Sequence, residues 1–129
     1  MKDLPTLRGE KVYLGPVPNT QEFYQEYLSW LNQERVKIGT GSQELNLEEV
    51  IELHEEWRND HQNITFCIFD AETDEPIGDI NLRYGVEEYD NNGPETAILI
   101  GKNFGKGKGR EAMNLLLDYA FRTLNLPIN

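Results

Sequence analysis

Apolar residues recur along the first half of the chain in patterns that predict one strand and two helices. Residues 10–14 alternate between polar and apolar side chains, which predicts a first strand. Residues 20–32 carry apolar side chains at three- and four-residue spacing, and Asn19 can cap the amphipathic helix that this spacing predicts. The same spacing over residues 47–58, preceded by the capping pattern of Asn46 with Glu49, predicts a second helix.

The second half of the chain begins with a β-rich pattern. Residues 64–69 are mostly β-branched or aromatic, and residues 73–76 predict a turn into a second β segment over residues 77–84. These two segments are expected to form a hairpin. In its second arm the apolar side chains face one way, and the polar ones face the other: Asp79, Asn81 and Arg83. This alternation predicts a sheet with one polar side.

A third β segment leads into a glycine-rich basic loop. A turn at residues 90–94 precedes a predicted strand over residues 95–100, and a third amphipathic helix is expected to begin near Arg110. Residues 126–129 are expected to start a further strand. The predicted order is therefore strand, helix, helix, antiparallel strands, glycine-rich loop and helix.

Length and composition limit what the chain can be. Its 129 residues are 38% hydrophobic and 27% charged, which predicts one domain spanning residues 1–129. No apolar run reaches the roughly eighteen residues of a membrane span, and the N-terminus lacks the apolar core of a signal peptide, so a cytoplasmic location is expected. The only cysteine, Cys67, and two scattered histidines, His54 and His61, predict neither a disulfide nor a metal site. Cys67 and His54 are expected to pack in the core.

Acidic residues outnumber basic ones by 23 to 12, which gives a formal net charge of −11. Such a charge repels nucleic acid and argues against it as a ligand. The charge favours a cationic partner, although ordinary solvated faces that keep the protein soluble are the commoner explanation of such an excess.

A concentration of glycine and cations after the third strand predicts a phosphate-binding loop. Its glycines remove the side chains that would keep an anion away from the backbone N–H groups: Gly105, Gly107 and Gly109. The N-terminus of the following helix adds roughly half a unit of positive charge. The cations expected to contact phosphate are Lys106, Lys108 and Arg110.

The run Phe-Gly-Lys-Gly-Lys-Gly-Arg-Glu-Ala at residues 104–112, together with the order of elements, resembles the GCN5-related N-acetyltransferase (GNAT) family, and most of all its RimJ/RimL type. The run Asp-Tyr-Ala-Phe at residues 118–121 adds to a likeness that covers essentially the whole chain. The resemblance implies an α+β fold in which a mostly antiparallel central sheet is flanked by helices, in the order β-α-α-β-β-β-α. The family continues with further strands and a helix that help to bind the coenzyme, and these are missing after residue 129.

The resemblance also implies a reaction, the transfer of an acetyl group from acetyl-CoA to a primary amine on a protein N-terminus, a polyamine or an aminoglycoside. The resemblance implies that a backbone N–H near Leu99 donates a hydrogen bond to the carbonyl oxygen of the acetyl group. It also implies that Glu95 is the base that accepts the proton of the amine. Asp79 and Asn81 are weaker candidates for contact with the acceptor. The residues implied in coenzyme binding are Ile98, Leu99, Ile100, Phe104, Gly105, Lys106, Gly107, Lys108, Gly109 and Arg110.

Other interpretations stay open. The spacing of Gly107, Gly109 and Ala112 fits the G-x-G-x-x-A pattern of dinucleotide sites, but the βαβ unit that would confirm it does not fit into the remaining sequence. The missing C-terminal part allows a coenzyme-binding or dimerising module without catalysis, or an inactive fragment of an enzyme. An open sheet edge near residues 126–129 favours a homodimer.

Overall fold

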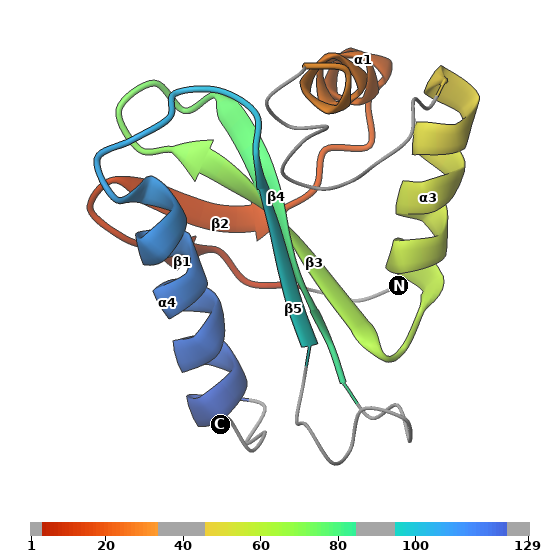
Figure 1. Cartoon of the computed structure of the whole chain (residues 1–129). Coiled ribbons are helices and arrows are strands. Elements are labelled where there is room, and N and C mark those ends of the chain that lie inside the picture. Colours follow the sequence, from red (N-terminus) through yellow and green to blue (C-terminus); the bar gives the residue numbers. More distant parts are fainter. Residues whose placement is uncertain (1–3, 34–45, 85–94, 124–129) are drawn as a thin grey trace.

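The computed structural model describes residues 4–33, 46–84 and 95–123 (Figure 1). In chain order its elements are β1 (Leu7–Arg8), β2 (Val12–Pro16), α1 (Gln21–Leu31), α3 (Leu47–Asn59), β3 (Asn63–Asp70), β4 (Pro76–Arg83), β5 (Glu95–Ile100) and α4 (Lys108–Arg122). The strands form one sheet in the order β1-β2-β3-β4-β5, and every neighbouring pair is antiparallel. The α+β fold with an antiparallel sheet and flanking helices, predicted from the sequence, is confirmed.

Helices cover both faces of the sheet. Figure 1 shows α4 on one face and α1 with α3 on the other. Between α4 and the sheet lies an apolar core that includes Ala112, Leu116, Phe66, Ile80 and Leu82. Beneath α1 and α3 lies a second core that includes Phe23, Tyr27, Trp30, Val50 and Leu99. The central strands are therefore buried on both sides.

The prediction of one polar, solvent-facing side along β4 is wrong. Asp79 lies on that side and is only 4% exposed, because α1 and α3 cover it. Alternation along a strand separates its two faces, but it does not reveal what covers each of them. Asn81 and Arg83, nearer the end of β4, remain partly exposed.

The helix starts follow the predicted capping pattern in one case and depart from it in another. Asn46 Oδ1 accepts the N–H of Glu49 at 2.9 Å, and the Glu49 side chain accepts the N–H of Asn46 at 3.0 Å, which confirms the capping pattern of the second helix. The cap of α1 is Thr20 rather than Asn19, because the Thr20 hydroxyl accepts an N–H from the first helical turn. The Asn19 side chain instead accepts a hydrogen bond from the Tyr24 hydroxyl at 2.6 Å.

Other element boundaries differ by a few residues from those predicted. Helix α4 begins at Lys108, two residues earlier than expected, and its N-cap is Gly107, whose backbone is left-handed. Strand β1, only two residues long, is too short to produce a detectable alternation. The predicted turn at residues 90–94 and the predicted strand at residues 126–129 lie outside the described residues.

Candidate functional site

The loop between β5 and α4 has a backbone rich in left-handed residues. Positive φ angles occur at Asn103 (54°), Gly105 (94°), Lys106 (59°) and Gly107 (74°). Gly107 is the N-cap of α4, and its carbonyl accepts the first helical bond, from the Glu111 N–H at 3.0 Å. Gly107 has no capping side chain, and none of the described residues accepts a hydrogen bond from the N–H groups of Gly109 and Arg110. The start of α4 therefore offers unpaired donors.

Packing against α1 fixes the point at which the loop leaves β5. A Cβ atom on Gly101 would collide with the Trp30 ring, so the close approach requires glycine. The N–H of Gly101 donates to the Ile77 carbonyl at 2.7 Å, and the Gly101 carbonyl accepts from the Gln33 side chain at 3.1 Å. The first residue of the loop is therefore held by strand β4 and by the end of α1.

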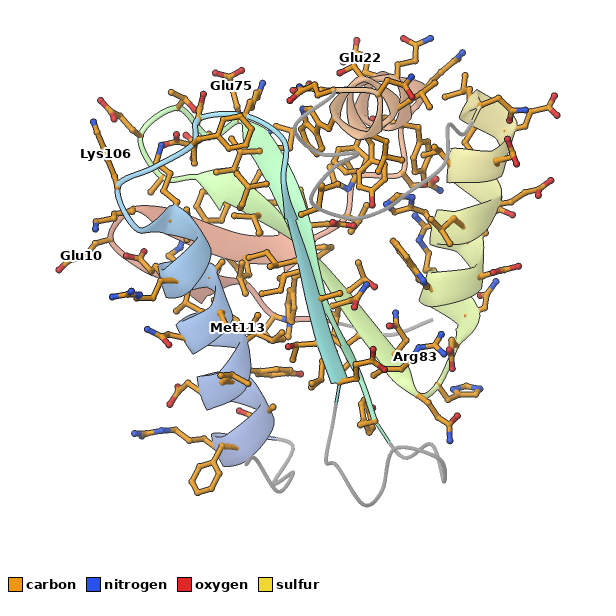
Figure 2. The ribbon with its side chains drawn as sticks, viewed as in Figure 1. Glu10, Glu22, Glu75, Arg83, Lys106 and Met113 are labelled. Atoms are coloured by element: carbon orange, nitrogen blue, oxygen red, sulfur yellow. The ribbon has the colours of Figure 1, made fainter. Side chains whose placement is uncertain are left out.

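Asp70, at the end of β3, holds two residues of the loop region. Its Oδ2 accepts a hydrogen bond from the Asn103 side chain at 2.9 Å and pairs with Lys108 Nζ at 3.0 Å. The hydrogen bond from Lys108 is the largest of several effects that lower the pKa of Asp70 to about 2. The charge of Lys108 is thus already paired, whereas Lys106 and Arg110 are exposed, and Figure 2 shows Lys106 projecting outward from the loop.

Glu111, in the first turn of α4, connects that helix to strand β2. Its Oε1 accepts the N–H groups of Lys11 at 2.7 Å and Val12 at 3.0 Å. A Cβ atom on Gly9 would collide with the same carboxylate, so the turn between β1 and β2 packs directly against it. The glutamate of the loop motif therefore fixes the start of α4 against the sheet.

The hydrogen-bond pattern of β5 decides which of its N–H groups face outward. Gly101 donates its N–H to Ile77 on β4, and Leu99 lies two residues earlier in the same antiparallel ladder. Because such ladders alternate, the N–H of Leu99 faces β4, and those of Ile98 and Ile100 face away from it. Within the described residues β5 is the last strand of the sheet, so these two N–H groups lie at its outer edge.

Comparison with known proteins identifies the family. A family model described as an acetyltransferase (GNAT) domain matches residues 13–128. The chain belongs to the GNAT family. Among its relatives, the alpha/beta-tubulin-N-acetyltransferase 9 of Drosophila melanogaster is 39% identical over 124 residues, which cover 87% of this chain and 60% of that protein. The N-acetyltransferase 9-like protein of Caenorhabditis briggsae is 32% identical over 120 residues, covering 85% of this chain and 60% of that protein. This GNAT chain spans about 60% of the length of these curated relatives.

Solved structures agree with the family assignment. An acetyltransferase from Agrobacterium tumefaciens superimposes with a TM-score of 0.74 at 27% identity, over 98% of this chain and 72% of that chain. A GNAT-family acetyltransferase from Bacillus anthracis gives a TM-score of 0.74 at 15% identity, over 95% of this chain and 69% of that chain, a likeness of fold alone. GNAT acetyltransferases use acetyl-CoA as cosubstrate.

A buried polar cluster lies beneath α1 and α3 of this GNAT domain. The Tyr27 hydroxyl hydrogen-bonds Asp79, and His54 Nε2 lies 3.9 Å from Asp79 Oδ2. His54 Nδ1 lies 3.0 Å from the Val50 carbonyl, so Nδ1 carries the proton of the neutral ring. Burial raises the pKa of Asp79 to about 7 and lowers the pKa of His54 to about 4. Nε2 and Oδ2 have no hydrogen-bond partner among the described residues.

Only part of this cluster could be predicted from the sequence. His54 is 2% exposed, which confirms its predicted place in the core. Asp79 was expected on an open face, although a lone carboxylate between Ile77 and Ile80 in a β-rich segment was a signal of a buried site. Tyr27 lies within residues 20–32, whose apolar spacing predicts only a helix face that packs in the core.

Glu95 lies at the start of β5 and is exposed. It shares a strand face with Leu99, and the step of four residues from one to the other corresponds to about 13 Å along the strand. Its partner across the ladder is Arg83, whose guanidinium forms an ion pair with Asp60 at 3.2 Å. The fold therefore places Glu95 and residues 98–100 on one strand without bringing them into contact.

Cys67 is buried on β3, as predicted, and burial raises the pKa of its thiol, so the thiol stays protonated. In the described ranges there is no group of three or more His, Cys, Asp or Glu side chains placed to hold a metal ion. No helix of the described GNAT domain is long and apolar enough to cross a membrane.

Replacing Glu111 by alanine is expected to lower the free energy of unfolding by about 2–3 kcal/mol, because the N–H groups of Lys11 and Val12 lose their acceptor. Urea unfolding followed by circular dichroism measures the loss. Asp118→Ala removes a carboxylate from an exposed site on the same helix and is the matched control, with an expected change below about 0.5 kcal/mol. Equal stability of the two variants would contradict the contact between Glu111 and β2.

Proposed function

We propose that this protein is an acetyl-CoA-dependent N-acetyltransferase that acts on a primary amine, with residues 1–129 as one acyl-CoA N-acyltransferase domain. The observation that carries the proposal is the helix start at Gly107, where the N–H groups of Gly109 and Arg110 have no acceptor among the described residues. A diphosphate satisfies such donors and also gains from the positive end of the helix dipole.

The coenzyme would lie along the loop and the edge of β5. Its diphosphate would accept hydrogen bonds from N–H groups of residues 104–110, with the exposed side chains of Lys106 and Arg110 as counter-charges. Lys108 would act chiefly through Asp70, by holding the loop in place. The pantetheine arm would pair with the backbone of residues 98–100, whose outward N–H groups belong to Ile98 and Ile100.

The reaction forms a bond between the amine nitrogen and the acetyl carbon and breaks the bond from that carbon to the coenzyme sulfur. The amine must first lose a proton, and the coenzyme leaves as a thiolate. The N–H of Leu99 faces β4, so an outward N–H, that of Ile98 or Ile100, would stabilise the carbonyl oxygen as negative charge develops on it. Glu95 would accept the proton through intervening water, because about 13 Å of strand separates it from Leu99.

The relatives narrow the choice of acceptor. The Drosophila melanogaster and Homo sapiens relatives are named as acetyltransferases of alpha/beta-tubulin, and the human protein is 33% identical over 133 residues. We therefore favour a protein acceptor over a polyamine or an aminoglycoside. The net charge of −11 would attract a cationic acceptor of any of these kinds. Membership of the RimJ/RimL type, a cytoplasmic location and a homodimer stay predictions.

Acetyl transfer can be tested with a panel of amines. The protein is incubated with acetyl-CoA and tubulin-derived peptides, spermidine or an aminoglycoside, and released thiol is followed by a chromogenic reagent. We expect thiol release with a peptide, and mass spectrometry identifies the acetylated nitrogen. The absence of thiol release with every acceptor would contradict the proposal.

The distance between Glu95 and residues 98–100 favours one alternative, a module that binds the coenzyme without catalysis. Calorimetry with CoA separates the two functions. Binding without thiol release supports the module, whereas binding with thiol release supports the enzyme.

A further inference from the structure

Two lysines between the end of β5 and the first turn of α4 are already paired with carboxylates. Lys102 Nζ lies 2.6 Å from Glu26 and 3.0 Å from Glu75, and Lys108 Nζ lies 3.0 Å from Asp70. Each of these ammonium groups therefore adds little net positive charge at the helix start. The counter-charge for an anion bound there must therefore come from other cations, such as the exposed Lys106 and Arg110.

A further lysine reaches the same place from the turn between β1 and β2. Lys11 Nζ lies 3.4 Å from the position that a Cβ atom on Gly107 would occupy. Gly107 is the N-cap of α4, so the ammonium lies beside the helix end that carries the unpaired N–H groups. Lys11 is exposed and forms no ion pair with any described residue.

The backbone of Lys11 is held from two sides. Its N–H donates to Glu111 Oε1 at 2.7 Å, and its carbonyl accepts the N–H of Ala71 at 2.9 Å. The neighbouring Glu10 projects outward from the turn (Figure 2). A fixed backbone that carries a flexible ammonium suits contact with a phosphate group, for which lysine acts as a point charge.

We propose that Lys11 is a coenzyme-binding residue whose ammonium contacts the diphosphate of acetyl-CoA at the start of α4. This inference rests on the proposed function, because it concerns the same bound coenzyme. Lys106 and Arg110 would contact the diphosphate from the loop and the helix, and Lys11 would contact it from the side of β2. The loop motif does not contain this residue, since Lys11 lies 100 residues before Glu111 in the sequence.

Isothermal titration calorimetry with CoA and with 3′-dephospho-CoA tests the inference. Both molecules contain the diphosphate, so Lys11→Gln should raise the Kd for each by about tenfold, while Lys11→Arg retains most of the affinity. Arg122→Gln removes the same charge at the far end of α4 and should change either Kd by less than about twofold. Unchanged melting temperatures are expected, because the backbone bonds of residue 11 remain.

The outcomes separate this inference from the proposed function. If the protein binds CoA and Lys11→Gln behaves like Arg122→Gln, the inference is overturned and the proposed function is untouched. A loss of affinity for CoA but not for 3′-dephospho-CoA would place Lys11 at the 3′-phosphate and would also overturn it. No binding of either molecule by the unaltered protein would overturn both, and binding without acetyl transfer would overturn only the proposed function.

Discussion

Gly107→Glu is expected to raise the Kd for CoA by about a hundredfold or more, the equivalent of about 2.7 kcal/mol of binding free energy. The Cβ atom of the new side chain would lie 3.4 Å from Lys11 Nζ. Its carboxylate could therefore pair with that ammonium and neutralise its charge. It would also occupy the positive end of α4 and repel a diphosphate. Calorimetric titration with CoA measures the loss.

A matched variant separates charge from backbone strain. Gly107 has a φ of 74°, so any side chain there strains the backbone by roughly 1–2 kcal/mol. Gly107→Gln introduces the same strain and nearly the same volume without the charge. We expect its Kd to lie between those of the unaltered protein and Gly107→Glu. An unchanged Kd of Gly107→Glu for CoA would contradict binding of the diphosphate at the start of α4.

The second large effect is a change in how stability depends on pH when either member of the His54–Asp79 pair is replaced. Folding raises the pKa of Asp79 from 3.8 to about 7, so its contribution to stability is fully present below pH 4 and is lost as the pH rises through 7. Folding lowers the pKa of His54 from 6.5 to about 4, so its contribution is present above pH 6.5 and is lost as the pH falls toward 4. The two slopes oppose each other between pH 4 and 6.5.

Single substitutions should therefore expose opposite slopes. In His54→Gln the carboxylate remains, and the free energy of unfolding should fall as the pH rises from 4 to 7. In Asp79→Asn the imidazole remains, and stability should fall as the pH drops from 6.5 to 4. Each change is expected to be on the order of 2–4 kcal/mol across its range.

Urea unfolding at intervals between pH 4 and 8 measures these profiles. Contributions from the other carboxylates are common to all three proteins, so the differences between profiles isolate the pair. Asp79→Asn should also be more stable than the unaltered protein at pH 8, because a desolvated charge is removed. Parallel profiles for all three proteins would contradict the assignment of perturbed pKa values to His54 and Asp79.

The elements that could be predicted from the sequence depend on local patterns. The apolar spacing of residues 20–32 and 47–58 predicted α1 and α3, and the pairing of Asn46 with Glu49 predicted a helix start, since both signals lie within a few residues. The loop at residues 104–110 was recognisable because its glycines and cations are consecutive in the chain.

What the sequence did not reveal depends on contacts between distant segments. The burial of Asp79 results from the packing of α1 and α3 over β4, and strand alternation contains no information about that cover. The approach of Lys11 to Gly107 depends on the bond between Glu111 and β2, which joins residues 100 positions apart. The adjacent residues Asn19 and Thr20 both have side chains that can cap a helix, and only the structure shows that Thr20 caps α1 while Asn19 accepts from the Tyr24 hydroxyl.

The most direct test of the central claim is a titration of the ¹⁵N-labelled protein with CoA, followed by ¹H–¹⁵N correlation spectra. If the start of α4 binds the diphosphate, the amide resonances of Gly105, Gly107, Gly109 and Arg110 should shift most and saturate together. Shifts confined to other parts of the molecule, with these four resonances unmoved at saturating CoA, would contradict the account.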